Sequence, residues 1–128
     1  MGDDSEFSGT WRCQHWWPSN NHDGEDTSIC DVRAEQTGRT VVFQSLPNEH
    51  DEYLLIRLKI DGDFANGSWT ENAATDGEFS GKLYNGLLSM IIADDRKSIT
   101  GKWVGIGRDV VLDKPDVFTG RWEFTRPE

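Results

Sequence analysis

Residues 7–17 read FSGTWRCQHWW, and this stretch predicts the opening β-strand of the fold. Alternate residues of a strand face the same side. One face of this strand therefore carries Phe7, Gly9, Trp11, Cys13, His15 and Trp17. That face is apolar at its start and chemically mixed at its end, a gradient that indicates a packed floor leading to a pocket.

A five-residue pattern that begins in this strand returns along the chain. It consists of an apolar residue, a small polar residue, glycine, any residue and a large apolar residue, and it starts at Phe7, Ala65, Phe79, Ile99 and Phe118. A glycine inside a strand leaves room for a neighbouring ring or for a bend of the sheet. The spacing is irregular, so the pattern predicts a curved, aromatic-rich antiparallel sheet rather than a repeat array.

Composition limits the classes of protein to which the chain can belong. Its 128 residues suit one domain spanning 1–128, with residues 1–6 as a disordered acidic tail. Six Trp and six Phe can fill a thin-walled barrel. The net charge of −10 argues against nucleic acid and anionic membranes as partners. No stretch reads as a signal peptide or a membrane span, so we expect a cytoplasmic protein.

Turn signals between the alternating segments predict how the strands connect. A hairpin between the first strand and residues 27–36 places Trp11 opposite Val32 and Cys13 opposite Cys30. Tight turns are predicted at Thr37-Gly38, Asp61-Gly62 and Asn85-Gly86, further turns at 94–97 and 114–116, and a strand break at 105–107. No segment has helical periodicity. The sequence thus predicts an all-β, up-and-down antiparallel barrel of eight to ten strands.

Gly9-Thr-Trp11 on the first strand resembles the Gly-x-Trp signature of the calycin superfamily, which includes the lipocalins. The resemblance implies a lipocalin-like barrel in which Trp11 plugs the floor and an arginine from the far end of the chain packs across it. Arg121 and Arg126 are the candidates. Gly9, Trp11 and Arg121 form the expected structural set.

A second resemblance covers the latter half of the chain. Residues 66–71, 81–86, 100–109 and 119–123 are similar to the C-terminal domain of actinobacterial Xre-type helix-turn-helix regulators. The resemblance implies a bacterial, ligand-sensing barrel and a regulatory protein as partner. Nothing in this chain reads as the DNA-binding head of those regulators, so a role in transcription is not carried over. No binding residue is established for that domain, and none is transferred.

Cys13 and Cys30 face each other in the predicted first hairpin, which allows three interpretations. They are reduced core cysteines that behave as small apolar residues, or a cross-strand disulfide, or ligands of zinc together with His15 and His22. The spacing matches no known zinc motif, and we expect no metal; the weak alternative set is Cys13, His15 and Cys30.

The inward faces of the predicted strands supply a candidate pocket. Its ligand-binding residues are His15, Trp17, Phe43, Leu54, Ile56, Trp69, Met90 and Trp103. Such a lining, apolar with one polar anchor, favours a small apolar or aromatic ligand held without a cofactor, in a sensor or carrier module.

Two other functions stay open at this point. One is a barrel enzyme of the cyclase or isomerase type, in which His15 is the acid–base candidate. The other is a protein-interaction module that uses Trp16 or the loop at 18–26.

Overall fold

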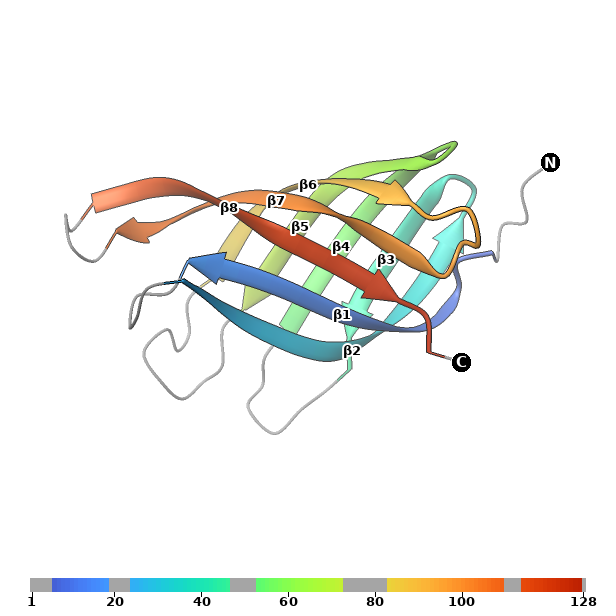
Figure 1. The fold of residues 1–128 in the computed structure, drawn as a ribbon. Coiled ribbons are helices and arrows are strands. Elements are labelled where there is room, and N and C mark those ends of the chain that lie inside the picture. Colours follow the sequence, from blue (N-terminus) through green and yellow to red (C-terminus); the bar gives the residue numbers. More distant parts are fainter. Residues whose placement is uncertain (1–5, 19–23, 47–52, 73–82, 110–113, 128) are drawn as a thin grey trace.

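The computed structural model describes residues 6–18, 24–46, 53–72, 83–109 and 114–127. Eight strands form a closed antiparallel barrel in which each strand pairs with its neighbours in the chain and β8 pairs with β1 (Figure 1). The strands are β1 Gly9–Pro18, β2 Glu25–Thr37, β3 Thr40–Ser45, β4 Tyr53–Asp61, β5 Phe64–Asn72, β6 Leu83–Ile92, β7 Ser98–Asp109 and β8 Lys114–Thr125.

The predicted all-β, up-and-down barrel is confirmed, and so is the register of its first hairpin. Trp11 lies opposite Val32 and Cys13 opposite Cys30. Closure removes the exposed edges that an open sheet would present. None of the described residues forms a helix long and apolar enough to cross a membrane.

The tight turns at Gly38 and Gly62 differ from the prediction by their position within each hairpin. Both glycines have positive φ, 60° and 62°, and each is the first of the two turn residues rather than the second. A hairpin turn that needs positive φ at its first position selects glycine there. The register therefore shifts by two residues, and Ala34 lies opposite Phe43 instead of Val41. A two-residue shift keeps every side chain on its predicted face.

The predicted turn at Asn85-Gly86 is wrong, because both residues lie inside β6. Asn85 pairs with Thr70, and Gly86 pairs with Trp69 on one side and Gly105 on the other. A Cβ at position 86 would lie 1.9 Å from the Val104 carbonyl oxygen and 2.8 Å from the Trp69 indole nitrogen, so glycine is required both by the neighbouring strand and by the ring. The strand predicted around residues 79–82 lies outside the described residues.

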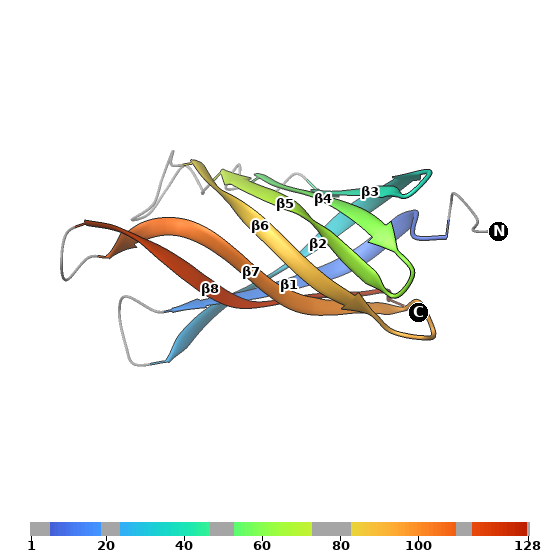
Figure 2. The ribbon, with the colours of Figure 1, turned by 90° about the horizontal axis from the view of Figure 1, so that it is seen from above.

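The predicted break at 105–107 and turn at 114–116 are also wrong, because β7 and β8 continue through them. The ladder between these strands runs to Asp109↔Lys114, whereas β6 leaves β7 at Gly105 and β1 leaves β8 at Trp122. The last part of the β7–β8 hairpin therefore projects beyond both neighbours, as Figures 1 and 2 show.

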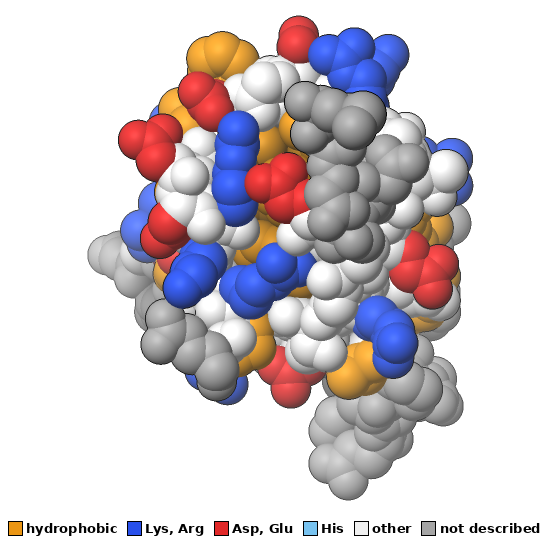
Figure 3. All heavy atoms as spheres, turned by 90° about the vertical axis from the view of Figure 1, so that its right-hand side faces the viewer, with side chains coloured by type: hydrophobic (Ala, Val, Ile, Leu, Met, Phe, Trp, Pro, Cys, Tyr) orange, Lys and Arg blue, Asp and Glu red, His pale blue; other side chains and the backbone are white. Residues whose placement is uncertain are grey.

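Three tight turns, β2–β3, β4–β5 and β6–β7, lie together at one end of the barrel, near the two termini (Figure 1). The turn predicted at 94–97 is one of them, and it joins β6 to β7. Figure 3 looks onto this end, where acidic and basic side chains are interspersed and hydrophobic side chains are visible between them.

Candidate functional site

The turn end of the barrel is closed by a group that we call the floor cluster: Phe7, Trp11, Phe43 and Phe124. All four side chains are at most 1% exposed. Phe43 stacks on Phe124 with ring centroids 4.2 Å apart, and the Trp11 ring stands edge-on to Phe43 at 5.9 Å. The Trp11 indole N–H donates to the Phe7 carbonyl over 2.8 Å. This end of the interior is therefore filled, with its indole hydrogen bond made inside the chain.

Arg126 covers the floor cluster from the C-terminal end of the chain. Its guanidinium lies 4.5 Å above the Trp11 ring and donates to the carbonyl oxygens of Glu6 and Ser8 at 2.9 and 2.8 Å. The arrangement implied by the calycin resemblance is present, with Arg126 in the role. Glu6, which the sequence placed in a disordered tail, is held by this contact and lies 3.6 Å from Arg96.

Arg121 does not pack on Trp11. It lies between Gly120 and Trp122 in β8, on the outer side of the barrel, because its inward neighbour is the buried Trp122. Its guanidinium covers the Trp16 ring at 4.2 Å and pairs with Glu25 at 3.6 Å. The strand alternation excludes it from the interior.

Cys13 and Cys30 are free thiols on paired positions of β1 and β2. Burial is the main cause that raises the pKa of the Cys13 thiol well above its ordinary value, and Cys30 adds to the rise. The Trp122 indole N–H donates to the Cys13 sulfur at 3.1 Å. Within the described part of the chain, no three His, Cys, Asp or Glu side chains gather to hold a metal ion, and His22 lies outside it.

The other half of the interior holds what we call the upper cluster: His15, Trp17, Trp69, Glu71, Trp103 and Trp122. The His15 ring stacks on Trp122 with ring centroids 4.5 Å apart. The centroid of the Trp17 ring, also on β1, lies 5.2 Å from that of His15. Trp69 meets Trp103 edge-on at 5.5 Å. Trp17 and Trp122 thus contact the imidazole directly, and Trp69 and Trp103 extend the cluster from Trp122.

Glycines in β6, β7 and β8 make space for these rings. A Cβ at Gly105 would approach Trp69 Cζ2 to 2.6 Å, and one at Gly120 would approach the Trp103 indole nitrogen to 2.6 Å. The Trp103 N–H donates to the Trp16 carbonyl over 2.7 Å, just beyond the last β1–β8 pair. Gly86, Gly105 and Gly120 therefore leave room for the Trp69 and Trp103 rings, whereas the glycines of the recurring pattern in β5 and β7 lie against backbone atoms of a neighbouring strand.

His15 and Glu71 approach each other across the interior. Their strands, β1 and β5, stand on opposite sides of the eight-stranded barrel. The two side chains therefore reach across the lumen, where His15 Nε2 and Glu71 Oε2 lie 3.6 Å apart. Burial lowers the pKa of His15 from 6.5 to about 4, so the imidazole is neutral at pH 7.

Two buried polar atoms of the upper cluster have no hydrogen-bond partner among the described residues. They are His15 Nδ1 and Trp69 Nε1. The indoles of Trp11, Trp103 and Trp122 all have acceptors. Leaving a buried polar group unpaired costs about 1–3 kcal/mol, so native proteins retain few of them.

The predicted pocket residues divide between the two ends of the barrel. His15, Trp17, Trp69 and Trp103 come together in the upper cluster. Leu54 pairs with Glu71, and Ile56 lies one inward position further along β4, between Phe43 and Trp69. Phe43 belongs to the floor cluster, and Met90 pairs with Ala65 near the β4–β5 turn.

The sequence prediction missed Glu71 and Tyr84, which face each other on β5 and β6. Glu71 continues the inward alternation of Ala65, Gly67 and Trp69, so the pattern contained the signal. The prediction did not place Tyr84 on an inward strand face, because it placed a turn at the next two residues, Asn85-Gly86.

Comparison with protein-family models, with curated proteins and with solved structures finds no match to this chain. The closed eight-stranded barrel is compatible with a calycin-like fold. The relationship to Xre-type regulators stays a prediction from the sequence.

Proposed function

We propose that the upper cluster binds a small, largely apolar aromatic molecule non-covalently, as part of a ligand-sensing or carrier protein. The observation that carries this proposal is a pair of buried atoms within a group of aromatic rings, His15 Nδ1 and Trp69 Nε1, to which no described residue hydrogen-bonds. A ligand that bonds both atoms recovers the free energy that the empty protein forgoes.

The hydrogen-bonding chemistry of the two atoms limits the class of ligand that fits. Trp69 Nε1 is a donor only and requires an acceptor on the ligand. Glu71 lies nearest to His15 Nε2, so we place the imidazole proton there, which leaves Nδ1 as an acceptor. The ligand that fits is a planar ring with an N–H or O–H donor beside a carbonyl oxygen.

Access to these atoms requires a movement at the end of β1. Both atoms are shielded from solvent, and the half-buried Trp17 ring lies next to His15 on the side of the strand end. Rotation of Trp17 away from His15 exposes the imidazole edge. Trp17 thus serves as a stacking wall in the bound state and as a cover in the free state.

Oxindole is a suitable probe because it is a fused aromatic ring with a lactam N–H and a carbonyl. Titration followed by tryptophan fluorescence should show binding, with affinity about three- to tenfold weaker in His15→Phe and in Trp69→Phe. Phe43→Leu, a floor variant, should bind oxindole as the wild type does. N-methyl oxindole, which lacks the donor, should lose affinity for the wild type but not for His15→Phe.

Native mass spectrometry of the purified protein, compared with a denatured spectrum, provides a test without a chosen probe. Extra mass of an organic molecule that disappears on denaturation supports the proposal. Equal oxindole affinity in wild type, His15→Phe and Trp69→Phe would contradict it.

A second function is favoured by the contact between His15 and Glu71, which is the arrangement of a general base with an orienting carboxylate. In this function His15 accepts a proton from a bound molecule, as a cyclase or isomerase requires. Deuterium exchange into the acidic carbon position of oxindole in D₂O tests it. Exchange faster than in buffer and lost in His15→Phe indicates catalysis, whereas binding without faster exchange leaves the carrier function.

A further inference from the structure

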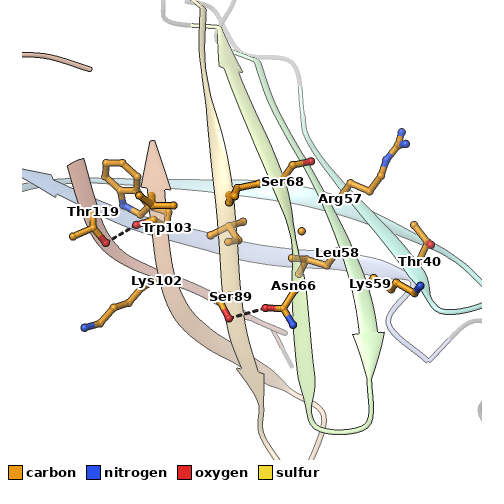
Figure 4. Close-up of a pocket in the computed structure, with 14 residues that line it drawn as sticks. Thr40, Arg57, Leu58, Lys59, Asn66, Ser68, Ser89, Lys102, Trp103 and Thr119 are labelled. Carbon is orange, nitrogen blue, oxygen red and sulfur yellow. Dashed lines mark hydrogen bonds between the residues drawn. The ribbon is translucent and has the colours of Figure 1, made fainter. Parts of the chain in front are cut away.

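The outer surface of the barrel carries a groove of about 850 Å³ over β3 to β8, which we call the outer groove (Figure 4). It lies on the opposite side of the sheet from the upper cluster, because its side-chain lining comes mainly from outward-facing residues. They include Arg57, Lys59, Asn66, Leu87, Ser89 and Lys102. We propose that the outer groove binds an extended, acidic segment of a partner protein.

The charge of the outer groove is opposite to that of the chain. The chain has 23 acidic and 13 basic residues, a net charge of −10. Among the described residues, the groove is lined by Arg57, Lys59 and Lys102 and by no Asp or Glu. All three cations are exposed, and none takes part in the ion pairs that the structure shows among its described residues. Their charge is therefore available to an acidic partner.

The register of the sheet places four of these residues in one row. Lys59 pairs with Asn66, Asn66 with Ser89, and Ser89 with Lys102, across β4 to β7. Figure 4 shows Asn66 and Ser89 between the two lysines, joined by a 2.7 Å hydrogen bond from the Ser89 hydroxyl to the Asn66 carbonyl oxygen. The amide nitrogen of Asn66 thus faces a partner as a donor.

The length of this row matches an extended polypeptide. Three strand spacings of about 4.8 Å separate the lysine positions by roughly 14 Å. An extended chain rises about 3.4 Å per residue, so residues four apart span the same length and share a face. Two carboxylates at that spacing can reach Lys59 and Lys102 together.

An apolar ledge beside the row supplies further contact. Leu87 pairs with Val104 on the neighbouring strand, and their side chains are 61% and 38% exposed. Leu87 precedes Ser89 by two residues, so it lies next to the centre of the row. An apolar residue midway between the two acids of the partner can pack there. The expected segment is therefore acidic, any, apolar, any, acidic.

Nucleic acid fits the outer groove less well. The net charge of −10 repels a phosphate backbone, and three cations neutralise few phosphates. Of the described residues in the lining, one is aromatic, Trp103; it is 7% exposed and faces the interior, so it offers bases no stacking surface.

The test uses a fluorescently labelled peptide with two glutamates four residues apart and a leucine midway between them. Fluorescence anisotropy should show binding that weakens with salt and that falls about tenfold in the Lys59→Glu, Lys102→Glu double variant. The matched control, Arg33→Glu with Lys114→Glu, makes the same charge change outside the groove and should leave most of the affinity. His15→Phe should bind the peptide as the wild type does, since the upper cluster is separate.

Three results would overturn the proposal. One is an equal loss of affinity in the groove variant and the control variant, which indicates general charge repulsion. Another is equal binding of a peptide with glutamines in place of the glutamates. The third is tighter, groove-dependent binding of a poly-thymidine oligonucleotide, which assigns the groove to nucleic acid.

Discussion

The floor cluster and the upper cluster are built from the same kinds of residue but differ in how their polar atoms are paired. At the floor, the Trp11 N–H has an acceptor and Arg126 is bonded to two carbonyl oxygens. In the upper cluster, His15 Nδ1 and Trp69 Nε1 are buried and have no hydrogen-bond partner within the described part of the chain. Aromatic packing alone therefore does not distinguish a candidate binding site from a structural core. Buried polar atoms that lack hydrogen bonds within that packing are what distinguish the candidate site.

Truncation of the floor should have the largest effect on stability. Trp11→Ala removes a fully buried indole, its hydrogen bond and the surface on which Arg126 lies. We expect the free energy of unfolding to fall by about 3–5 kcal/mol, measured by urea denaturation. Trp17→Ala, at the half-buried cover of the upper cluster, should cost clearly less. Similar losses in the two variants would break the distinction between a structural floor and the proposed binding site at the upper end.

Acid should destabilise the upper cluster through His15. The native imidazole has a pKa of about 4 and the ordinary value is 6.5, so the unfolded chain takes up a proton first as the pH falls. Stability is therefore full above pH 6.5 and declines as the pH falls toward 4, by roughly 3 kcal/mol from this group. Urea denaturation across this range should show a shallower decline in His15→Gln. Parallel curves for the two proteins would mean that the pKa of His15 is the same in the native and the unfolded protein.

Adding a side chain at a glycine that lies against an indole should displace the Trp69 ring of the upper cluster. In Gly105→Ala the new methyl group would lie 2.6 Å from Trp69 Cζ2, so the ring must move. We expect a loss of about 1–3 kcal/mol and an altered tryptophan emission spectrum. Gly38→Ala is an instructive control, because a Cβ there meets no atom within 4 Å and its cost comes from the positive φ alone. Unchanged emission in Gly105→Ala would show that Trp69 is not held by this glycine.

The smallest expected effect is on the free energy of unfolding when the indole nitrogen of Trp11 or of Trp69 is removed. Trp11→Phe loses a satisfied hydrogen bond, whereas Trp69→Phe removes an unpartnered N–H at a similar loss of ring volume. The first variant should therefore be less stable than the second by about 1 kcal/mol. Matched thermal and urea denaturation of the two variants measures the difference. If Trp69→Phe is the less stable of the two, Trp69 Nε1 has a partner in solution.

The prediction from sequence succeeded where a period of two decides the outcome. The inward face of β1 and the pairing of Cys13 with Cys30 follow from alternation and from one long hairpin. The same alternation located His15, Trp69 and Trp103 on the inward side. It could not locate Glu71 beside His15, because residues on opposite strands of a barrel meet only after closure.

Local turn chemistry misled the prediction at Asn85-Gly86. The pair is favourable for a tight turn, yet Gly86 is needed inside β6 to admit the Trp69 ring. Packing of a large ring outweighed a local preference. Arg126 rather than Arg121 lies on Trp11 for a different reason, since the strand alternation of β8 directs Arg121 outward.

The sequence by itself determined the class of fold, the inward faces and the presence of one imidazole among aromatic rings, because these depend on local alternation and composition. The register of the β2–β3 and β4–β5 hairpins, the contact of His15 with Glu71 and the row from Lys59 to Lys102 became visible only in the folded barrel. A register shift of two residues leaves every face unchanged, so alternation is blind to it. Contacts across the lumen and across four strands depend on that register and on closure, and these are set by the packing of the whole barrel.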